Sequence, residues 1–198
     1  LPTQRRRQRQ MCIRDRERRG YLSAGPFVPE VVLEHPEVVT QLHREFIRAG
    51  SDVVQAFTYY GHREKLRIIG KEHLLEPMQK GALKIAKDAA AEYKDLDLMV
   101  CGDVANTNVF DPGDPNTHKQ CQQMYEEQVA WAKEAGVDFV IAETISWTDE
   151  MKIALKAIKD AGLIAVCNFA IPRGDKTREG HSAEDACKMM EDLGADVV

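Results

Sequence analysis

The sequence predicts an α/β fold with a parallel sheet, and three observations point to it. One unit recurs at residues 34–60, 131–143 and 189–198: a helical pattern, a glycine, an acidic residue and a buried apolar strand. Successive predicted strands lie 25 to 45 residues apart, as in a (β/α)8 barrel. No glycine-rich phosphate loop follows a strand, so a doubly wound nucleotide-binding sheet is the weaker alternative.

The first unit is predicted from the periodicity of residues 34–60. Apolar side chains recur at helical spacing from Val38 to Ile47, with polar residues between them. Gly50 then ends the helix, because a residue without Cβ can adopt the left-handed cap conformation. Residues 52–60 are rich in strand formers and end in two tyrosines, so we expect the first strand there.

The later elements follow from the same patterns. Helices are predicted at residues 64–69, 77–94, 117–135 and 148–159, and from 182 onward. Strands are predicted at residues 97–103, 137–142 and 163–169, with another starting at 197. Residues 106–117 are rich in turn formers and are predicted to form a loop. Thr148, Asp149 and Glu150 are expected to cap the helix that they open, and Gly162 is expected to end it. Ser182 is expected to open the last helix as its cap.

Charge and cysteine content exclude several classes. The net charge is −5, and because residues 1–19 hold eight arginines, the remainder is still more acidic, unlike a nucleic-acid-binding domain. No apolar run approaches the ~18 residues of a membrane helix, so we expect no membrane partner. Five scattered cysteines without a CxxC pair favour a reduced, cytoplasmic protein.

The basic head is interpreted separately. It lacks the apolar region of a signal peptide, and it is richer in Gln than in Ser, which argues against targeting. Residues 11–16 (MCIRDR) resemble the translation of a library-preparation adapter. We therefore predict that residues 1–16 are not native and that the domain spans residues 17–198.

Residues at the carboxyl ends of the strands are the candidates for a site, because either architecture places its site there. Glu143 follows an apolar run, and a carboxylate buried alone would cost several kcal/mol. It is either a ligand for a substrate ammonium group, a general base, or a structural partner of a loop cation or N–H group. Tyr59 and Tyr60, predicted to lie on a strand, should point to opposite faces, so that only one lines the pocket. That ring could bind a quaternary ammonium group, or it could simply pack.

Other reactive side chains are given structural interpretations. Cys101 and Cys167 lie within predicted strands and are expected to be small buried hydrophobes without metal-ligand spacing. Four histidines are expected at the surface: His35, His43, His62 and His73.

Residues 19–26, 34–51 and 55–60 resemble the betaine–homocysteine S-methyltransferase family, and residues 137–143 fit its fourth strand. The resemblance implies a zinc-dependent (β/α)8 barrel that transfers a methyl group from betaine or a related donor to the thiol of homocysteine, giving methionine. It implies that Glu143 holds the homocysteine amino group and that Tyr60 and Phe27 enclose the donor trimethylammonium. The further residues expected beside the pocket are Gln55, Thr58 and Tyr59.

Departures from the family pattern limit these expectations. Ala56 and Thr144 replace a Thr and a Tyr, which leaves a different methylated amine or a sulfonium possible as the donor. The family's first-strand Asp-Gly-Gly is absent, and its zinc cysteines are expected beyond Val198. The resemblance therefore implies an incomplete (β/α)8 TIM barrel, strands 2 to 6, lacking the first strand and the last two.

We expect this fragment to be inactive by itself and the intact parent to be an enzyme that could form a homo-oligomer. The central geometric prediction is that Tyr60 and Glu143 look into one hollow. Two alternatives stay open: a barrel enzyme of other chemistry, such as a corrinoid-linked methyltransferase or a lyase, and an inert fragment.

Overall fold

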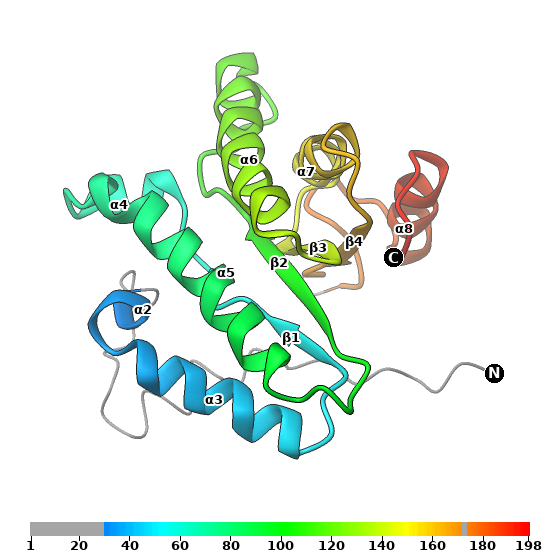
Figure 1. The fold of residues 1–198 in the computed structure, drawn as a ribbon. Coiled ribbons are helices and arrows are strands. Elements are labelled where there is room, and N and C mark those ends of the chain that lie inside the picture. Colours follow the sequence, from blue (N-terminus) through cyan, green and yellow to red (C-terminus); the bar gives the residue numbers. More distant parts are fainter. Residues whose placement is uncertain (1–29, 172–173) are drawn as a thin grey trace. The chain divides into compact units, whose positions relative to one another are not determined.

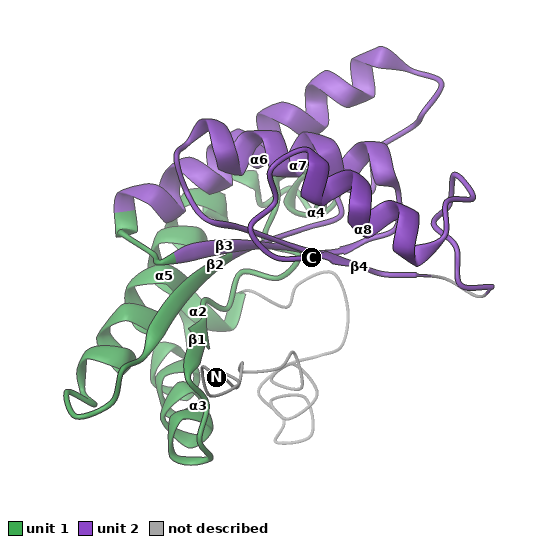
Figure 2. Cartoon of the chain, turned by 90° about the vertical axis from the view of Figure 1, so that its right-hand side faces the viewer, with its two compact units in different colours: residues 1–102, 135–138 green, residues 103–134, 139–198 purple. Residues whose placement is uncertain are grey.

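The computed structural model describes residues 30–171 and 174–198. The chain divides into two compact units, shown in different colours in Figure 2. Of the described residues, unit 1 comprises 30–102 and 135–138, and unit 2 comprises 103–134, 139–171 and 174–198. The described residues form four strands, which are β1 (Val53–Gln55), β2 (Met99–Ala105), β3 (Phe139–Ile145) and β4 (Ala165–Phe169). They are hydrogen-bonded in chain order, with β1 parallel to β2 and β3 parallel to β4. The predicted α/β class with parallel strands is confirmed.

Unit 1 contains four helices, a 3-10 turn and the first strand pair among its described residues (Figure 1). Its elements are α2 (Val31–Glu34), α3 (Pro36–Arg48), β1 (Val53–Gln55), α4 (Arg63–Ile68), η2 (Glu72–Leu74), α5 (Leu75–Ala91) and the start of β2 (Met99–Ala105). A core cluster joins α2, α3 and α5 to Phe57, which follows β1. The predicted apolar face of α3 is confirmed, since Val38, Leu42 and Ile47 are buried.

Among its described residues, unit 2 holds the remainder of β2, three helices and two further strands. They are α6 (Pro115–Ala135), β3 (Phe139–Ile145), α7 (Thr148–Asp160), β4 (Ala165–Phe169) and α8 (Ala183–Asp192). Val197 makes a parallel bridge to Val166 of β4, where the sequence predicts a further strand to start. Ser182 caps α8 as predicted, because its Oγ accepts a hydrogen bond of 3.0 Å from the Asp185 N–H.

The acidic residue of the recurring unit has a structural reason. Asp138 accepts a hydrogen bond of 2.6 Å from the Val100 N–H at the start of β2. Asp196 does the same for the Ala165 N–H of β4 at 2.8 Å, and that contact lowers the pKa of its carboxyl. Each carboxylate therefore binds the amino end of the preceding strand. The preceding glycine has positive φ in both repeats, which lets the helix stop and the chain turn back.

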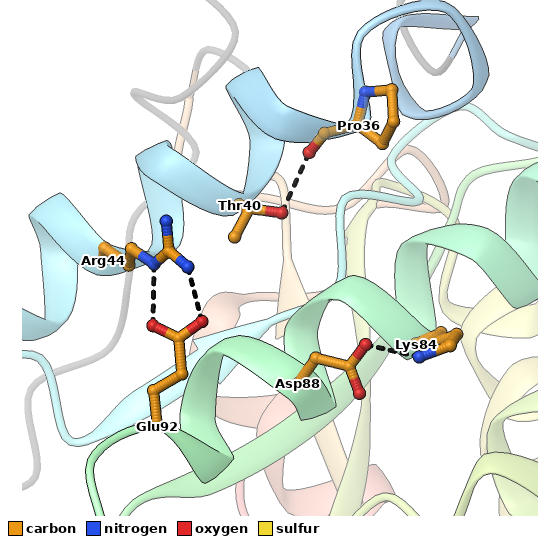
Figure 3. A network of polar contacts seen from close by, with 6 residues as sticks. All are labelled: Pro36, Thr40, Arg44, Lys84, Asp88 and Glu92. Carbon is orange, nitrogen blue, oxygen red and sulfur yellow. Dashed lines mark hydrogen bonds and ion pairs between the residues drawn. The ribbon is translucent and has the colours of Figure 1, made fainter.

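On the surface of unit 1, a bidentate ion pair links α3 to the end of α5, as Figure 3 shows. Arg44 donates from Nε and Nη2 to the two oxygens of Glu92, at 2.7 and 2.6 Å. The two helices lie side by side in Figure 1, and their buried faces share the core cluster. Both charged groups face solvent, where an ion pair contributes little to stability. We therefore infer that the buried apolar faces, and not this ion pair, hold α3 against α5.

Candidate functional site

The end of β1 is a turn rather than a continued strand. The strand stops at Gln55, whose side chain is buried, and the Thr58 N–H then bonds back to the Ala56 carbonyl at 2.9 Å. The Gly61 N–H donates to the Thr58 carbonyl at 2.7 Å. Tyr60 has a φ of 59°, a left-handed conformation that bulky residues rarely adopt. The predicted strand over residues 52–60 is therefore wrong beyond Gln55.

The two tyrosines of this turn contact each other. The ring centroids of Tyr59 and Tyr60 lie 4.1 Å apart, with planes inclined by 44°. The prediction that they point to opposite faces of a sheet is wrong, because left-handed Tyr60 brings its ring back onto Tyr59. The Lys65 Nζ lies 4.6 Å from the Tyr60 centroid, so this ring already attracts a cation in the structure.

His62 completes the turn, and sequence reasoning missed it. Its side chain is 2% exposed, and its ring meets Tyr60 edge-on, with centroids 6.4 Å apart. Burial, assisted by the charge of Lys65, lowers the pKa of His62 to about 4, so the imidazole is neutral near pH 7. Neither ring nitrogen has a hydrogen-bond partner among the residues that the structure describes.

The prediction of four surface histidines is half wrong. His35 and His73 are exposed, whereas His43 and His62 are buried. The position of His43 carried a usable signal, because it follows Leu42 and precedes Phe46 and Ile47 on the apolar face of α3. For His62 no such periodicity existed, since it lies in a turn.

The end of β3 carries the predicted carboxylate. Glu143 is 2% exposed and lies opposite Asn168 of β4 in the parallel register. The register shifts between Glu143 and Ile145, because Thr144 bulges out with a φ of 58°. Positive φ is strained for a β-branched residue, and such strain concentrates at functional sites. The bulge therefore marks this strand end as the candidate site of unit 2.

Polar side chains link the ends of β2 and β3. The Thr144 hydroxyl lies 2.6 Å from the Glu143 carbonyl and 3.4 Å from Asn106 Oδ1. Asn106 donates from Nδ2 to Asn108 Oδ1 at 2.7 Å, and Asn108 is also left-handed, with a φ of 63°. The strand ends therefore carry a hydrogen-bonded polar surface around Glu143.

Below this surface lies a second buried carboxylate, Glu150, whose role the sequence did not reveal. Its Oε1 accepts from the Thr107 N–H at 2.8 Å, the Thr107 hydroxyl at 2.7 Å and the Tyr125 hydroxyl at 3.1 Å. Cys121 Sγ lies 3.1 Å from the same Thr107 hydroxyl. Burial raises the pKa of Cys121 to about 11 and that of Tyr125 well above its ordinary value, so both remain protonated donors.

The predicted cap of α7 is wrong. Thr148, Asp149 and Glu150 all lie inside the helix, and none supplies a side-chain cap. Instead Glu179, from the segment after β4, accepts a hydrogen bond of 3.0 Å from the Asp149 N–H. The Arg178 N–H donates to the Ser146 carbonyl at 3.0 Å and anchors the same segment. The cap comes from 30 residues away, which no local sequence rule covers.

The described residues do not fit a zinc centre. They contain no group of three or more His, Cys, Asp or Glu side chains that could hold a metal ion. Cys101 and Cys167 are buried, as predicted, and burial raises the pKa of Cys167 to about 12. Phe27 and Cys12 lie outside the described residues. No helix in the described part of the chain is long and apolar enough to cross a bilayer.

Parallel strands alternating with helices define the class as an α/β domain, with strained residues and a buried carboxylate at strand ends as its candidate site. The family model for homocysteine S-methyltransferase matches residues 10–198. The chain belongs to the homocysteine S-methyltransferase family.

Individual relatives agree with this assignment. The chain is 35% identical over 164 residues to betaine–homocysteine S-methyltransferase 1 of Bos taurus, which covers 80% of the chain and 39% of that protein. Its counterpart from Xenopus tropicalis is 33% identical over 187 residues, which covers 92% of the chain and 45% of that protein. The chain therefore spans about two fifths of these relatives.

A solved structure shows the same fold. The metallated form of the homocysteine methyltransferase MmuM from Escherichia coli superimposes with a TM-score of 0.77. The superposition covers 90% of this chain and 67% of that one, at 18% sequence identity. At this identity the similarity supports the fold alone, and it agrees with the parallel α/β arrangement.

Proposed function

We propose that this chain is part of an enzyme that transfers a methyl group from betaine, or a related methylated donor, to the thiol of homocysteine. The thiolate sulfur would attack the donor methyl carbon, forming a C–S bond as the C–N or C–S bond of the donor breaks. The leaving amine or sulfide keeps the electron pair, and the thiol proton goes to solvent. The family membership of residues 10–198 supports the reaction class.

The observation that carries this proposal is Glu143, a buried carboxylate at the end of β3 beside the strained Thr144. We propose that it binds the ammonium group of homocysteine. A buried carboxylate attracts a cationic group strongly, because water screens the attraction less there than at the surface.

For the methyl donor we propose the turn after β1. Tyr60 would attract the cationic donor through its ring face, with Tyr59 supporting it, and Gln55 and Thr58 would lie beside the pocket. Phe27 is proposed as a second aromatic wall. The donor could be betaine or a related compound, because Ala56 and Thr144 stand where the family resemblance implies a Thr and a Tyr.

We also propose the finer assignments that the sequence implies. The domain would be residues 17–198, forming strands 2 to 6 of an incomplete (β/α)8 barrel in a cytoplasmic enzyme. The similarity to a solved homocysteine methyltransferase over 90% of the chain supports such a fold. The complete enzyme would be zinc-dependent, with ligands other than the residues described.

The test uses the full-length protein that carries this chain, supplied with homocysteine and either betaine or a methylated sulfonium. We expect methionine to form and E143Q to lower kcat/KM by about 100-fold, the scale on which a misplaced substrate reacts more slowly. The matched control is D149N, which removes an exposed carboxylate that pairs with Lys152.

The role of Glu143 is tested more sharply with 4-mercaptobutyrate, which is homocysteine without its amino group. The wild type should prefer homocysteine strongly, and E143Q should lose most of that preference. An unchanged preference in E143Q would contradict the role of Glu143, whereas absence of methionine formation by the wild type would contradict the reaction itself.

A further inference from the structure

We propose that Glu150 is a positioning residue that fixes Thr107, and through it Asn106 and the Glu143–Thr144 bulge, in the geometry that binds homocysteine. This inference rests on the proposed function of Glu143. Glu150 itself lies in the first turn of α7 and would touch neither substrate. It would act through the loop that follows β2.

The hydrogen bonds at Glu150 are the first support. A single oxygen, Oε1, accepts three of them: two from Thr107, at 2.8 and 2.7 Å, and one from Tyr125, at 3.1 Å. The carboxylate is only 2% exposed, so these donors replace its water. Its place in the first turn of α7 adds the favourable field of the helix N-terminus.

The second support is the path from Thr107 to the bulge. Because Thr107 gives both its N–H and its hydroxyl to one oxygen, the backbone leaving β2 is held at two points. Asn106 precedes it directly, and Asn106 Oδ1 lies 3.4 Å from the Thr144 hydroxyl. That hydroxyl lies 2.6 Å from the Glu143 carbonyl. Four consecutive contacts or bonds therefore connect Glu150 to the proposed ammonium anchor.

The third support is the strain that this path has to maintain. Thr144 holds a φ of 58°, and a β-branched residue keeps such a conformation only where its surroundings impose it. Asn106 Oδ1 is one part of those surroundings, because it accepts from the Thr144 hydroxyl. Loosening Thr107 should therefore let the bulge relax and move Glu143.

The network has two arms, which makes the role testable. The Thr107 arm leads to the bulge, whereas the Tyr125 arm leads into the buried face of α6. Both arms end on the same oxygen and both are buried. If Glu150 served stability alone, cutting either arm would have the same consequence.

The experiment compares Thr107→Val, Thr107→Ser and Tyr125→Phe in the full-length protein. Thr107→Val keeps the backbone bond to Glu150, so we expect it to fold. It should raise KM for homocysteine about tenfold, the scale of one lost hydrogen bond to a charged group, and change kcat less. Thr107→Ser should restore the wild-type KM. Tyr125→Phe should lower Tm and leave KM unchanged.

A structural readout keeps this test separate from that of the proposed function. The backbone amide resonance of Thr144 should shift in Thr107→Val and stay in place in Tyr125→Phe. If the wild type did not methylate homocysteine, the proposed function would fail, while the amide shift would still decide the positioning role. Equal loss of Tm in both variants, with unchanged KM and an unmoved Thr144 amide, would overturn it.

Discussion

The ends of β1 and β3 are built from different interactions. In unit 1, the turn after β1 is held by ring contacts among Tyr59, Tyr60 and His62. In unit 2, the end of β3 is held by directional hydrogen bonds that lead to the buried carboxylate of Glu150. Ring contacts tolerate small changes of shape, whereas hydrogen bonds to a buried charge fix distances and angles.

This difference matches what the two proposed substrates require. Donors that share a positive charge but differ in shape can be accommodated by an aromatic surface. Homocysteine has one ammonium group and one thiol on a short flexible chain, so a rigid anchor for the ammonium group limits where the thiol can lie.

Glu150→Ala should have the largest effect on stability, because it removes the acceptor of the buried donors of Thr107 and Tyr125. We expect the free energy of unfolding to fall by about 3–5 kcal/mol, as for other broken buried charge networks. Urea denaturation of the full-length protein measures this value. Glu126→Ala, which removes an exposed carboxylate from α6, is the control and should stay close to the wild type. Similar losses in both variants would contradict the contrast.

His62 should make stability depend on pH. Its pKa in the folded protein is about 4, below the ordinary value of 6.5. Between pH 6.5 and about pH 4 the unfolded chain binds a proton at His62 that the folded chain does not bind. The contribution of His62 to the free energy of unfolding therefore falls as the pH decreases to about 4, and it is constant below that. The loss attributable to His62 is about 3 kcal/mol over that window.

The measurement is the free energy of unfolding of wild type and His62→Gln between pH 7 and pH 4. The difference between the two should shrink or reverse as the pH falls, because only the wild type carries the burial cost of this imidazole. His73→Gln, at an exposed histidine of unit 1, should keep the wild-type dependence, since His62 is still present. Parallel curves for wild type and His62→Gln would show that His62 takes up its proton without penalty.

Tyr59→Leu should have a moderate effect, because it removes one ring of the pair but keeps an apolar side chain. We expect a loss of about 0.5–1.5 kcal/mol of stability, the value of an aromatic pair beyond its buried area. KM for the methyl donor should rise while KM for homocysteine stays unchanged. A change confined to homocysteine would show that the turn after β1 does not serve the donor.

The exposed pair of Arg44 and Glu92 should matter least, although its geometry is good. Both side chains face solvent, so water and salt weaken their attraction. A double-mutant cycle of Arg44→Met and Glu92→Gln should give a coupling close to the experimental scatter, and smaller still in 1 M salt. A coupling as large as the loss of stability expected for Glu150→Ala would mean that hydrogen-bond geometry matters more than burial in this protein.

Much of the fold could be predicted from the sequence, because the signals are local. The apolar face of α3, the helix stops at Gly50 and Gly162, and the Ser182 cap all depend on neighbours within a few residues. The buried strand before Glu143 could also be predicted, because the sequence shows an apolar run that ends at a carboxylate. These predictions concern where elements lie.

The candidate site was only partly predictable. Tyr59 and Tyr60 were identified, but their contact depends on the left-handed Tyr60, which no residue-type preference indicates. Glu150 appeared to be a helix cap until the structure placed Thr107 and Tyr125 on it, from 43 and 25 residues away. The cap of α7 comes from Glu179 for the same reason.

By itself, the sequence determined the alternation of helices and parallel strands and the family, because periodicity and motifs are written in consecutive residues. Only the tertiary structure decided how Glu150 is held by donors, which turn is strained and which histidine is neutral. Those properties depend on desolvation and on partners that folding brings together.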